Sequence, residues 1–283
     1  MIRHHFARTA LAVALAAAAG SASAFDFGLH VEDQLDAHSM QLFGIVEPLI
    51  ESAPPTTGAY RTAAQAASAQ VLLAKGLKVE YLTRSAANAV DMFSFWPSDA
   101  APTHLIACIE GGRSQLTGDA DTSAYAPGDK FNPSVQRIDL ATGAVETILR
   151  GMTACDGIRT TPWGTVLATE ETDDGGAYEI LDPLAITNHT IKDRATGEIV
   201  DAAGATVTTA IAKRTALPTI AWEGLDITHD GVVYAGDEER PGTTADGGGS
   251  TNDRDGGAIF KFVPSVAWTG AAVAGFVGLW LGW

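Results

Sequence analysis

The sequence predicts an all-β protein, a partial β-propeller built from repeated units of about 67 residues. The first observation is an internal repeat: CDGIRTTPWGTVLATEE at 155–171 aligns without a gap on WEGLDITHDGVVYAGDE at 222–238. The second is the pattern within each unit, where short apolar runs alternate with Gly, Pro, Asp and Asn turns and no long helix is evident. Repeated four-stranded sheets arranged radially are the blades of a propeller.

The first 24 residues have the features of a secretory signal peptide. Arg3 and Arg8 supply the basic start, TALAVALAAAAG is the apolar centre, and SASA offers small residues before a cut after Ala24. The mature chain is therefore expected in the periplasm or outside the cell.

An N-terminal segment at 25–95 precedes the repeats, and we expect it to be irregular and partly helical. Its best helix candidate is the Ala-rich stretch TTGAYRTAAQAASAQVLLAKGL at 56–77.

The propeller domain is predicted at 96–283, with three clear blades. DGGAYEILDP at 174–183 matches DGGAIFKFVP at 255–264 and extends the repeat beyond its first two strands. A fainter upstream copy joins HLIACIEGG at 104–112 to VQRIDLATGAVETIL, two alternating apolar runs around Ala-Thr-Gly that are typical of a hairpin. Three blades do not close a propeller, which needs four to eight, so the domain is predicted to be incomplete.

The tail at 262–283 carries no charge. It is long enough to span a bilayer, but it holds several glycines and no basic residue follows it. We favour a blade that begins near Gly257 over a membrane anchor.

The formal net charge of −16 makes nucleic acid an unlikely partner. The acids have two interpretations: they keep an exported protein soluble, or those at strand ends hold hard cations such as calcium.

The two cysteines, Cys108 and Cys155, would form one disulfide by default in an oxidising compartment. Cys108 lies in a run typical of a buried strand, where cysteine packs as a small apolar residue. Cys155 lies at a turn rich in Gly and Thr. We therefore predict that the two are not bonded to each other.

The repeat also aligns acids, because Asp156 falls on Glu223 and Glu170 falls on Asp237. Equivalent positions of successive blades lie around one axis, so these acids should share a site. Carboxylates packed closely need cations to neutralise them. Side chains alternate along a strand, so only one of Glu170 and Glu171 need face the axis.

The Thr-Pro-Trp-Gly turn with its Glu-Glu pair, the WEGLDIT and GVVYAGDEE motifs, and AIFKFVP together resemble the PhoX-type alkaline phosphatases over residues 104–268. The resemblance implies a six-bladed propeller with a calcium and iron cluster. It also implies a secreted, metal-dependent phosphohydrolase that uses a metal-bound hydroxide on small phosphate monoesters. The alternative hypothesis is a calcium-stabilised propeller that binds a ligand without catalysis.

Carried over to this chain, the resemblance makes Cys155 a thiolate ligand of the metals. The carboxylate ligands would be Glu170, Glu171 and Glu223, with Asp237 or Glu238 completing the ring. Trp222-Glu223-Gly224 departs from the family's common His-Glu-Ala but keeps the carboxylate.

Two arginines, Arg159 and Arg240, lie beside the acidic clusters and are the candidates for steadying the phosphate. The alternative for each is a plain salt bridge to a neighbouring acid.

Overall fold

The computed structural model describes residues 26–47, 49, 65–113, 131–238 and 258–265, and the chain divides into two units, 1–81 and 82–283. The predicted signal peptide and most of the tail lie outside the described residues. Among the residues that are described, no helix is long and apolar enough to cross a membrane.

The first unit contains the helix α2 (Phe27–Phe43), which begins at a capping residue and ends at a glycine. The Asp26 side chain accepts a hydrogen bond from the Leu29 amide at 3.0 Å, and Gly44 closes the helix with a φ of 69°. The helix predicted at 56–77 is wrong in its described part, 65–77, which holds only the 3-10 turn η1 (Ala67–Ala69). That turn has no side-chain cap, and short uncapped helices are marginal in water.

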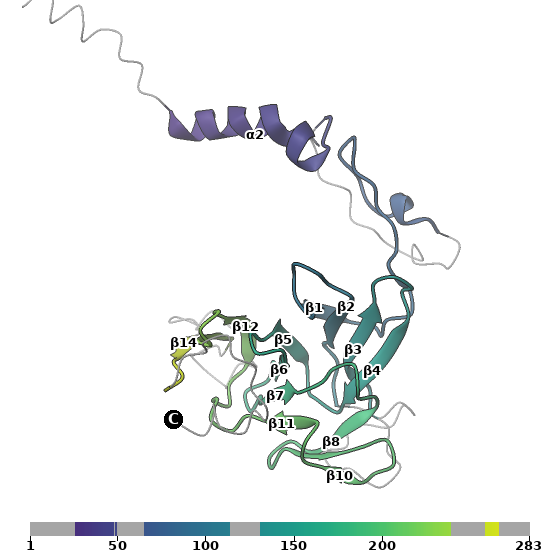
Figure 1. Ribbon diagram of the computed structural model, residues 1–283, viewed down its shortest axis with the longest axis vertical. Helices are drawn as coiled ribbons and strands as arrows, with labels where there is room; N and C mark the ends of the chain where they lie inside the picture. The colour runs from purple at the N-terminus through teal and green to yellow at the C-terminus, as the bar shows by residue number, and fades with distance from the viewer. Residues whose placement is uncertain (1–25, 48, 50–64, 114–130, 239–257, 266–283) are drawn as a thin grey trace, which may run out of the picture. The chain divides into compact units, whose positions relative to one another are not determined.

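The second unit is made of β-strands, which confirms the all-β class for the repeats (Figure 1). Within its described residues the strands form three sheets, in the orders β1-β2-β3-β4-β8-β9-β10, β11-β7-β6-β5 and β12-β13-β14. The strands are β1 (Val90–Trp96), β2 (His104–Ile109), β3 (Pro133–Asp139), β4 (Val145–Arg150), β5 (Cys155–Thr160), β6 (Val166–Glu170), β7 (Ala177–Ile180), β8 (His189–Asp193), β9 (Glu198–Val200), β10 (Thr206–Val207), β11 (Ile211–Lys213), β12 (Trp222–Ile227), β13 (Val233–Asp237) and β14 (Ile259–Phe262).

The internal repeat is confirmed in the register of two hairpins. Cys155 of β5 pairs with Glu170 of β6, and at the aligned positions Trp222 of β12 pairs with Asp237 of β13. Each hairpin then has a register shift before regular pairing resumes. The repeat therefore records a shared backbone conformation and not an accident of composition.

The third strand of the repeat differs from the sequence alignment by one residue. Val166 pairs with Ile180, and its counterpart Val233 pairs with Phe262, whereas the ungapped alignment placed Lys261 opposite Ile180. A shift of one residue exchanges the two faces of a strand. It brings an apolar side chain, Phe262, against the core that also holds Val233.

The upstream copy also folds as predicted, since β3 and β4 form an antiparallel hairpin around Ala141-Thr142-Gly143. Most of β1 falls within the segment 25–95, which was expected to be irregular and partly helical, but β1 pairs with β2 and opens the first sheet. The division between units accordingly falls at Tyr81 and Leu82, earlier than the expected boundary at residues 95 and 96.

The opening strands of the three sheets lie next to one another, because β5 contacts both β1 and β12. A main core forms between the first two sheets, around Ile106, Ile158 and Val166. Strands β8, β9 and β10 leave the second repeat and join the first sheet, where β8 pairs parallel to β4. The described sheets do not close on themselves.

Candidate cation site

Three hairpins present acids at matching positions. In each hairpin the first residue of the first strand pairs with a residue of the second strand, and an acid directly follows each of these two paired residues. The same backbone hydrogen bond fixes the second acid each time: the amides of Glu110, Glu171 and Glu238 donate to the carbonyls of Ala89, Ala154 and Ala221 at 2.8, 2.8 and 2.9 Å. The three pairs of acids are Asp91 and Glu110, Asp156 and Glu171, and Glu223 and Glu238.

Three of these acids converge on one point between the second and third sheets. Asp156, Glu171 and Glu223 each offer a carboxylate oxygen, and these oxygens lie within 4.8 Å of one another. Asp156 is buried, Glu171 is half-buried and Glu223 is exposed, so the group opens to solvent on one side. We call these three residues the acidic triad.

The crowding of carboxylates raises two pKa values. Burial, and then a hydrogen bond with Glu223 and its charge, raise the pKa of Asp156 to about 7, and Asp91 and Glu110 add to the effect. A hydrogen bond with Glu238, followed by burial, raises the pKa of Glu171 to about 8. All three acid pairs therefore act on the same point, and without a cation part of the group must hold protons.

Glu170 lies outside the triad, although it was predicted as a metal ligand. Its side chain is 1% exposed, and Arg194 reaches it with Nε at 2.7 Å and Nη2 at 3.2 Å. The amides of Thr153 and Gly176 donate to its two oxygens at 2.8 and 3.0 Å. Glu170 therefore has a structural role: its buried carboxylate accepts hydrogen bonds from Arg194 and from the backbone at Thr153 and Gly176.

Breaking that anchor gives a first testable prediction. Replacing Arg194 by Met should lower the free energy of unfolding by about 2 kcal/mol, because a buried carboxylate loses its charged donor. Urea denaturation measures the change. Lys192→Met, which removes an ion pair with Glu198 at the surface of the neighbouring strand, should cost much less. Equal losses in the two variants would contradict the assigned role of Glu170.

Asp237, the counterpart of Glu170, also lies outside the triad. It accepts a hydrogen bond from the Ala221 amide at 3.2 Å. Of the predicted metal ligands, the structure therefore brings Glu171 and Glu223 together. Glu238 is hydrogen-bonded to Glu171. Of the neighbouring residues Glu170 and Glu171, only Glu171 belongs to the acidic triad.

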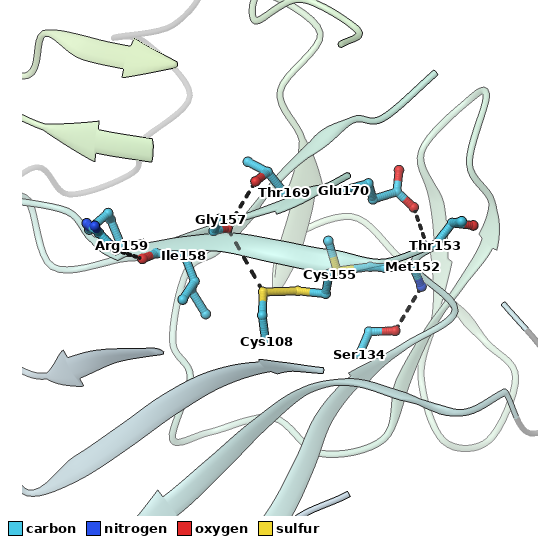
Figure 2. Close-up of a disulfide and its surroundings, with 10 residues drawn as sticks. All are labelled: Cys108, Ser134, Met152, Thr153, Cys155, Gly157, Ile158, Arg159, Thr169 and Glu170. Carbon is cyan, nitrogen blue, oxygen red and sulfur yellow. Dashed lines mark hydrogen bonds between the residues drawn. A yellow bond between two sulfur atoms is a disulfide. The ribbon is translucent and has the colours of Figure 1, made fainter. Parts of the chain in front are cut away.

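The predicted thiolate ligand is wrong, because Cys155 is bonded to Cys108 (Figure 2). The two Cα atoms are 5.0 Å apart, and both side chains are fully buried. The repeat indicates a buried position for Cys155, since the residue aligned with it is Trp222, which is also fully buried. The position is a core position in both hairpins and does not belong to the open site. The disulfide ties the first sheet to the second.

Arg159 lies toward the end of β5 away from the disulfide, as Figure 2 shows, and its Nε is 3.7 Å from Asp226 Oδ1. The salt-bridge interpretation of Arg159 is thus the one that the structure bears out. Arg240 lies outside the described residues.

Sequence reasoning missed Asp91 and Glu110 as contributors to the site. The signal is present as Ala-Val-Asp at 89–91, which matches Ala-Cys-Asp at 154–156 and Ala-Trp-Glu at 221–223. The match is hard to see in the sequence because the connection between β1 and β2 is longer than the connections in the two later hairpins, which are equal in length.

The donor set decides which cation fits. The triad supplies only carboxylate oxygens, the ligands preferred by hard cations such as calcium. It contains neither a histidine nor a free thiolate, so the described residues do not match the thiolate-bound iron that the family resemblance implied.

The titration of the triad gives a second prediction, for protein freed of divalent cations. Raised pKa values mean that the folded chain binds more protons than the unfolded chain between about pH 4 and pH 8, so stability should fall as pH rises through that window. Carboxylates with lowered pKa values, such as Asp139 and Asp193, titrate below it. Thermal unfolding across this range tests the trend, which calcium should remove. A melting temperature that rises with pH in chelator would contradict it.

The chain matches no protein-family model, and no curated protein matches it.

Proposed function

We propose that the chain is a calcium-binding protein whose acidic triad holds the cation where the second and third sheets meet. The observation that carries the proposal is the meeting of three carboxylate oxygens within 4.8 Å, from Asp156, Glu171 and Glu223. Like charges at that spacing repel, and a divalent cation turns the repulsion into attraction. Because Asp156 and Glu223 belong to different sheets, the ion would cross-link them.

A propeller arrangement is part of the same proposal. The contacts of β5 with β1 and β12 support it, since the innermost strands of adjacent blades are neighbours around the axis. Matching acids on successive blades would then line one end of that axis.

Thermal unfolding with calcium and with chelator tests this function. Calcium should raise the melting temperature in a concentration-dependent way, because a ligand that binds only the folded state stabilises it by mass action. Magnesium is the comparison, since its small octahedral shell suits an all-carboxylate triad less well. Equal melting temperatures in excess calcium and in chelator would contradict the proposal.

A second candidate function is calcium-dependent hydrolysis of phosphate monoesters, which would make the chain an enzyme. The specific support is that Glu171 and Glu223, two of the carboxylates that the PhoX resemblance assigns to the metals, belong to the triad. Bound calcium would act as a Lewis acid on a phosphoryl oxygen.

The enzyme hypothesis is tested with 4-nitrophenyl phosphate. Hydrolysis should require calcium, stop in chelator and fall sharply in the Glu223→Gln variant. If calcium raises the melting temperature but 4-nitrophenyl phosphate is not hydrolysed, the function is calcium binding without catalysis.

A further inference from the structure

The three sheets pack face to face in chain order, and the internal repeat shows which face of each sheet meets its neighbour. One face of the second sheet, which carries Cys155 and Ile158, packs into the main core with the first sheet. The equivalent face of the third sheet, with Trp222 and Leu225, packs into a second core that contains Leu167 from the opposite face of the second sheet. We call the face of this kind, turned toward the preceding sheet, the near face, and the opposite one the far face.

The near face of the first sheet is exposed where the near faces of the other two sheets are buried. Phe93 is the fourth residue of β1, as Ile158 is of β5 and Leu225 is of β12, and a register shift precedes each of them. Phe93 is 55% exposed, whereas Ile158 and Leu225 are 0% and 3% exposed. Val90, the first residue of β1, is 44% exposed, although the first residues of β5 and β12 are fully buried. Core positions of the repeat are therefore uncovered in the first sheet.

The far face of the third sheet is exposed in the same way. Tyr234 of β13 aligns with Leu167 of β6 in the repeat, and the two side chains are 36% and 1% exposed. Ile259 and Ala177, the first residues of β14 and β7, have matching places in the strand pairing, and they are 83% and 1% exposed. Val263, directly after β14, is 50% exposed. The third sheet covers the far face of the second, and no sheet of the described residues covers the far face of the third.

These two exposed faces are of the kinds that already pack together twice within the chain. The far face of one sheet meets the near face of the next between the first and second sheets, and again between the second and third. By the same fit, the far face of the third sheet in one copy accepts the near face of the first sheet in another copy. Exposed apolar patches of this kind mark association surfaces.

The exposed area is large enough for a dimer only when two such contacts form. The side chains concerned are Val90, Phe93, Phe95, Tyr234, Ile259 and Val263. At roughly 150–250 Å² for a whole large side chain, their exposed parts amount to on the order of 500 Å². Two contacts then bury on the order of 1,000 Å², the lower limit for a specific interface, and one contact buries half of that.

Two-fold symmetry forms both contacts at once. Each copy offers one face of each kind, so an open row of copies leaves a face uncovered at either end, whereas a pair related by a two-fold axis leaves none. The pair contains six sheets, which lies within the four to eight of a closed propeller. We propose that two copies of this chain form such a closed dimer, in which the first sheet of each packs on the third sheet of the other. This dimer rests on the propeller arrangement proposed above and is independent of calcium binding and of hydrolysis.

Sedimentation equilibrium of the full chain tests the dimer. About 0.15 M salt screens the repulsion between two chains that each carry a formal net charge of −16. The parent should have the mass of a dimer at micromolar concentration. Ile259→Glu changes the third sheet and Phe93→Glu changes the first. Each should weaken the dimer by about a hundredfold or more, because the buried charge enters both contacts.

Leu184→Glu is the matched control. Leu184 is 41% exposed in the connection between β7 and β8 and belongs to neither face, so its replacement should leave the dimer unchanged. Circular dichroism checks that each variant is folded. Val263→Glu and Val90→Glu take the place of the third-sheet and first-sheet variants if either is not.

Mixing the Ile259→Glu protein with the Phe93→Glu protein distinguishes this pairing from a face that pairs with itself. In the mixed dimer both changes fall in one contact, and the other contact has parent residues on both sides. The two variants should therefore bind each other at least about tenfold more tightly than either binds itself.

A monomeric parent, a dimer that only one of the two variants weakens, or a mixture that associates no better than its components would overturn the proposal. Assemblies of more than two copies would overturn the closed ring. The calcium function is judged separately, by the melting temperature. A calcium effect on a monomeric chain would contradict the dimer alone, and a dimer whose melting temperature calcium does not change would contradict the calcium function alone.

Discussion

Removing the disulfide with the double change Cys108→Ala and Cys155→Ala should lower the free energy of unfolding by about 4 kcal/mol. The bond closes a loop between residues separated by 47 positions, and releasing a loop of that length gives the unfolded chain about this much free energy. Urea denaturation of the parent and the double variant measures the difference. The loss should be accompanied by weaker calcium binding, because the bond holds the first sheet, which carries Asp91 and Glu110, against the second.

Thiol titration of the denatured parent is the control for this prediction. Protein purified without reductant should show no free thiol, since both cysteines are in the bond. Two titratable thiols, or a double variant within about 1 kcal/mol of the parent, would contradict the disulfide and restore the original prediction of an unbonded Cys155.

Replacing Glu223 by Gln should weaken calcium binding by about tenfold or more, because it removes one charge from the ligand set while keeping the shape. In metal-free protein the same change should raise the melting temperature by about 1–3 °C, since the Glu223 charge no longer raises the pKa of Asp156. The two opposite effects distinguish a ligand from a solvated acid.

Glu146→Gln is the matched control for Glu223→Gln. Glu146 is an exposed acid paired with Arg137 on the first sheet, and its replacement should leave calcium binding unchanged. A Glu223→Gln protein that binds calcium as tightly as the parent would exclude Glu223 as a ligand.

The hairpins could be predicted from the sequence because their turns and acids recur at fixed offsets. Gly164 and Gly231 hold matching left-handed positions in the two turns, with φ values of 83° and 90°. The third strand could not be placed to the residue, because a loop of different length precedes β7 and β14. The register of β14 depends on which of its residues packs against the core, and the structure places Phe262 there. An ungapped alignment does not show this.

The site was predicted in part for the same reason. The repeat predicts Glu171 and Glu223 as members of the site. Glu170 is distinguished from them by its ion pair with Arg194, a residue in the connection between β8 and β9, outside the aligned segments. The disulfide could not be predicted from local context, because Cys155 adjoins a stretch rich in Gly and Thr in the sequence, whereas in the structure it is fully buried at the start of β5 and bonded to Cys108. Burial and long-range pairing are properties of the fold, and the local sequence does not contain them.

Calorimetric titration of calcium into chelator-treated protein at pH 7 tests the central claim most directly, when it is carried out in two buffers that differ in ionisation enthalpy. Asp156 and Glu171, with pKa values of about 7 and about 8, hold protons there that a cation must displace. The account predicts saturable binding with the release of about one proton per calcium ion. No saturable binding at millimolar calcium, or binding without proton release, would contradict it.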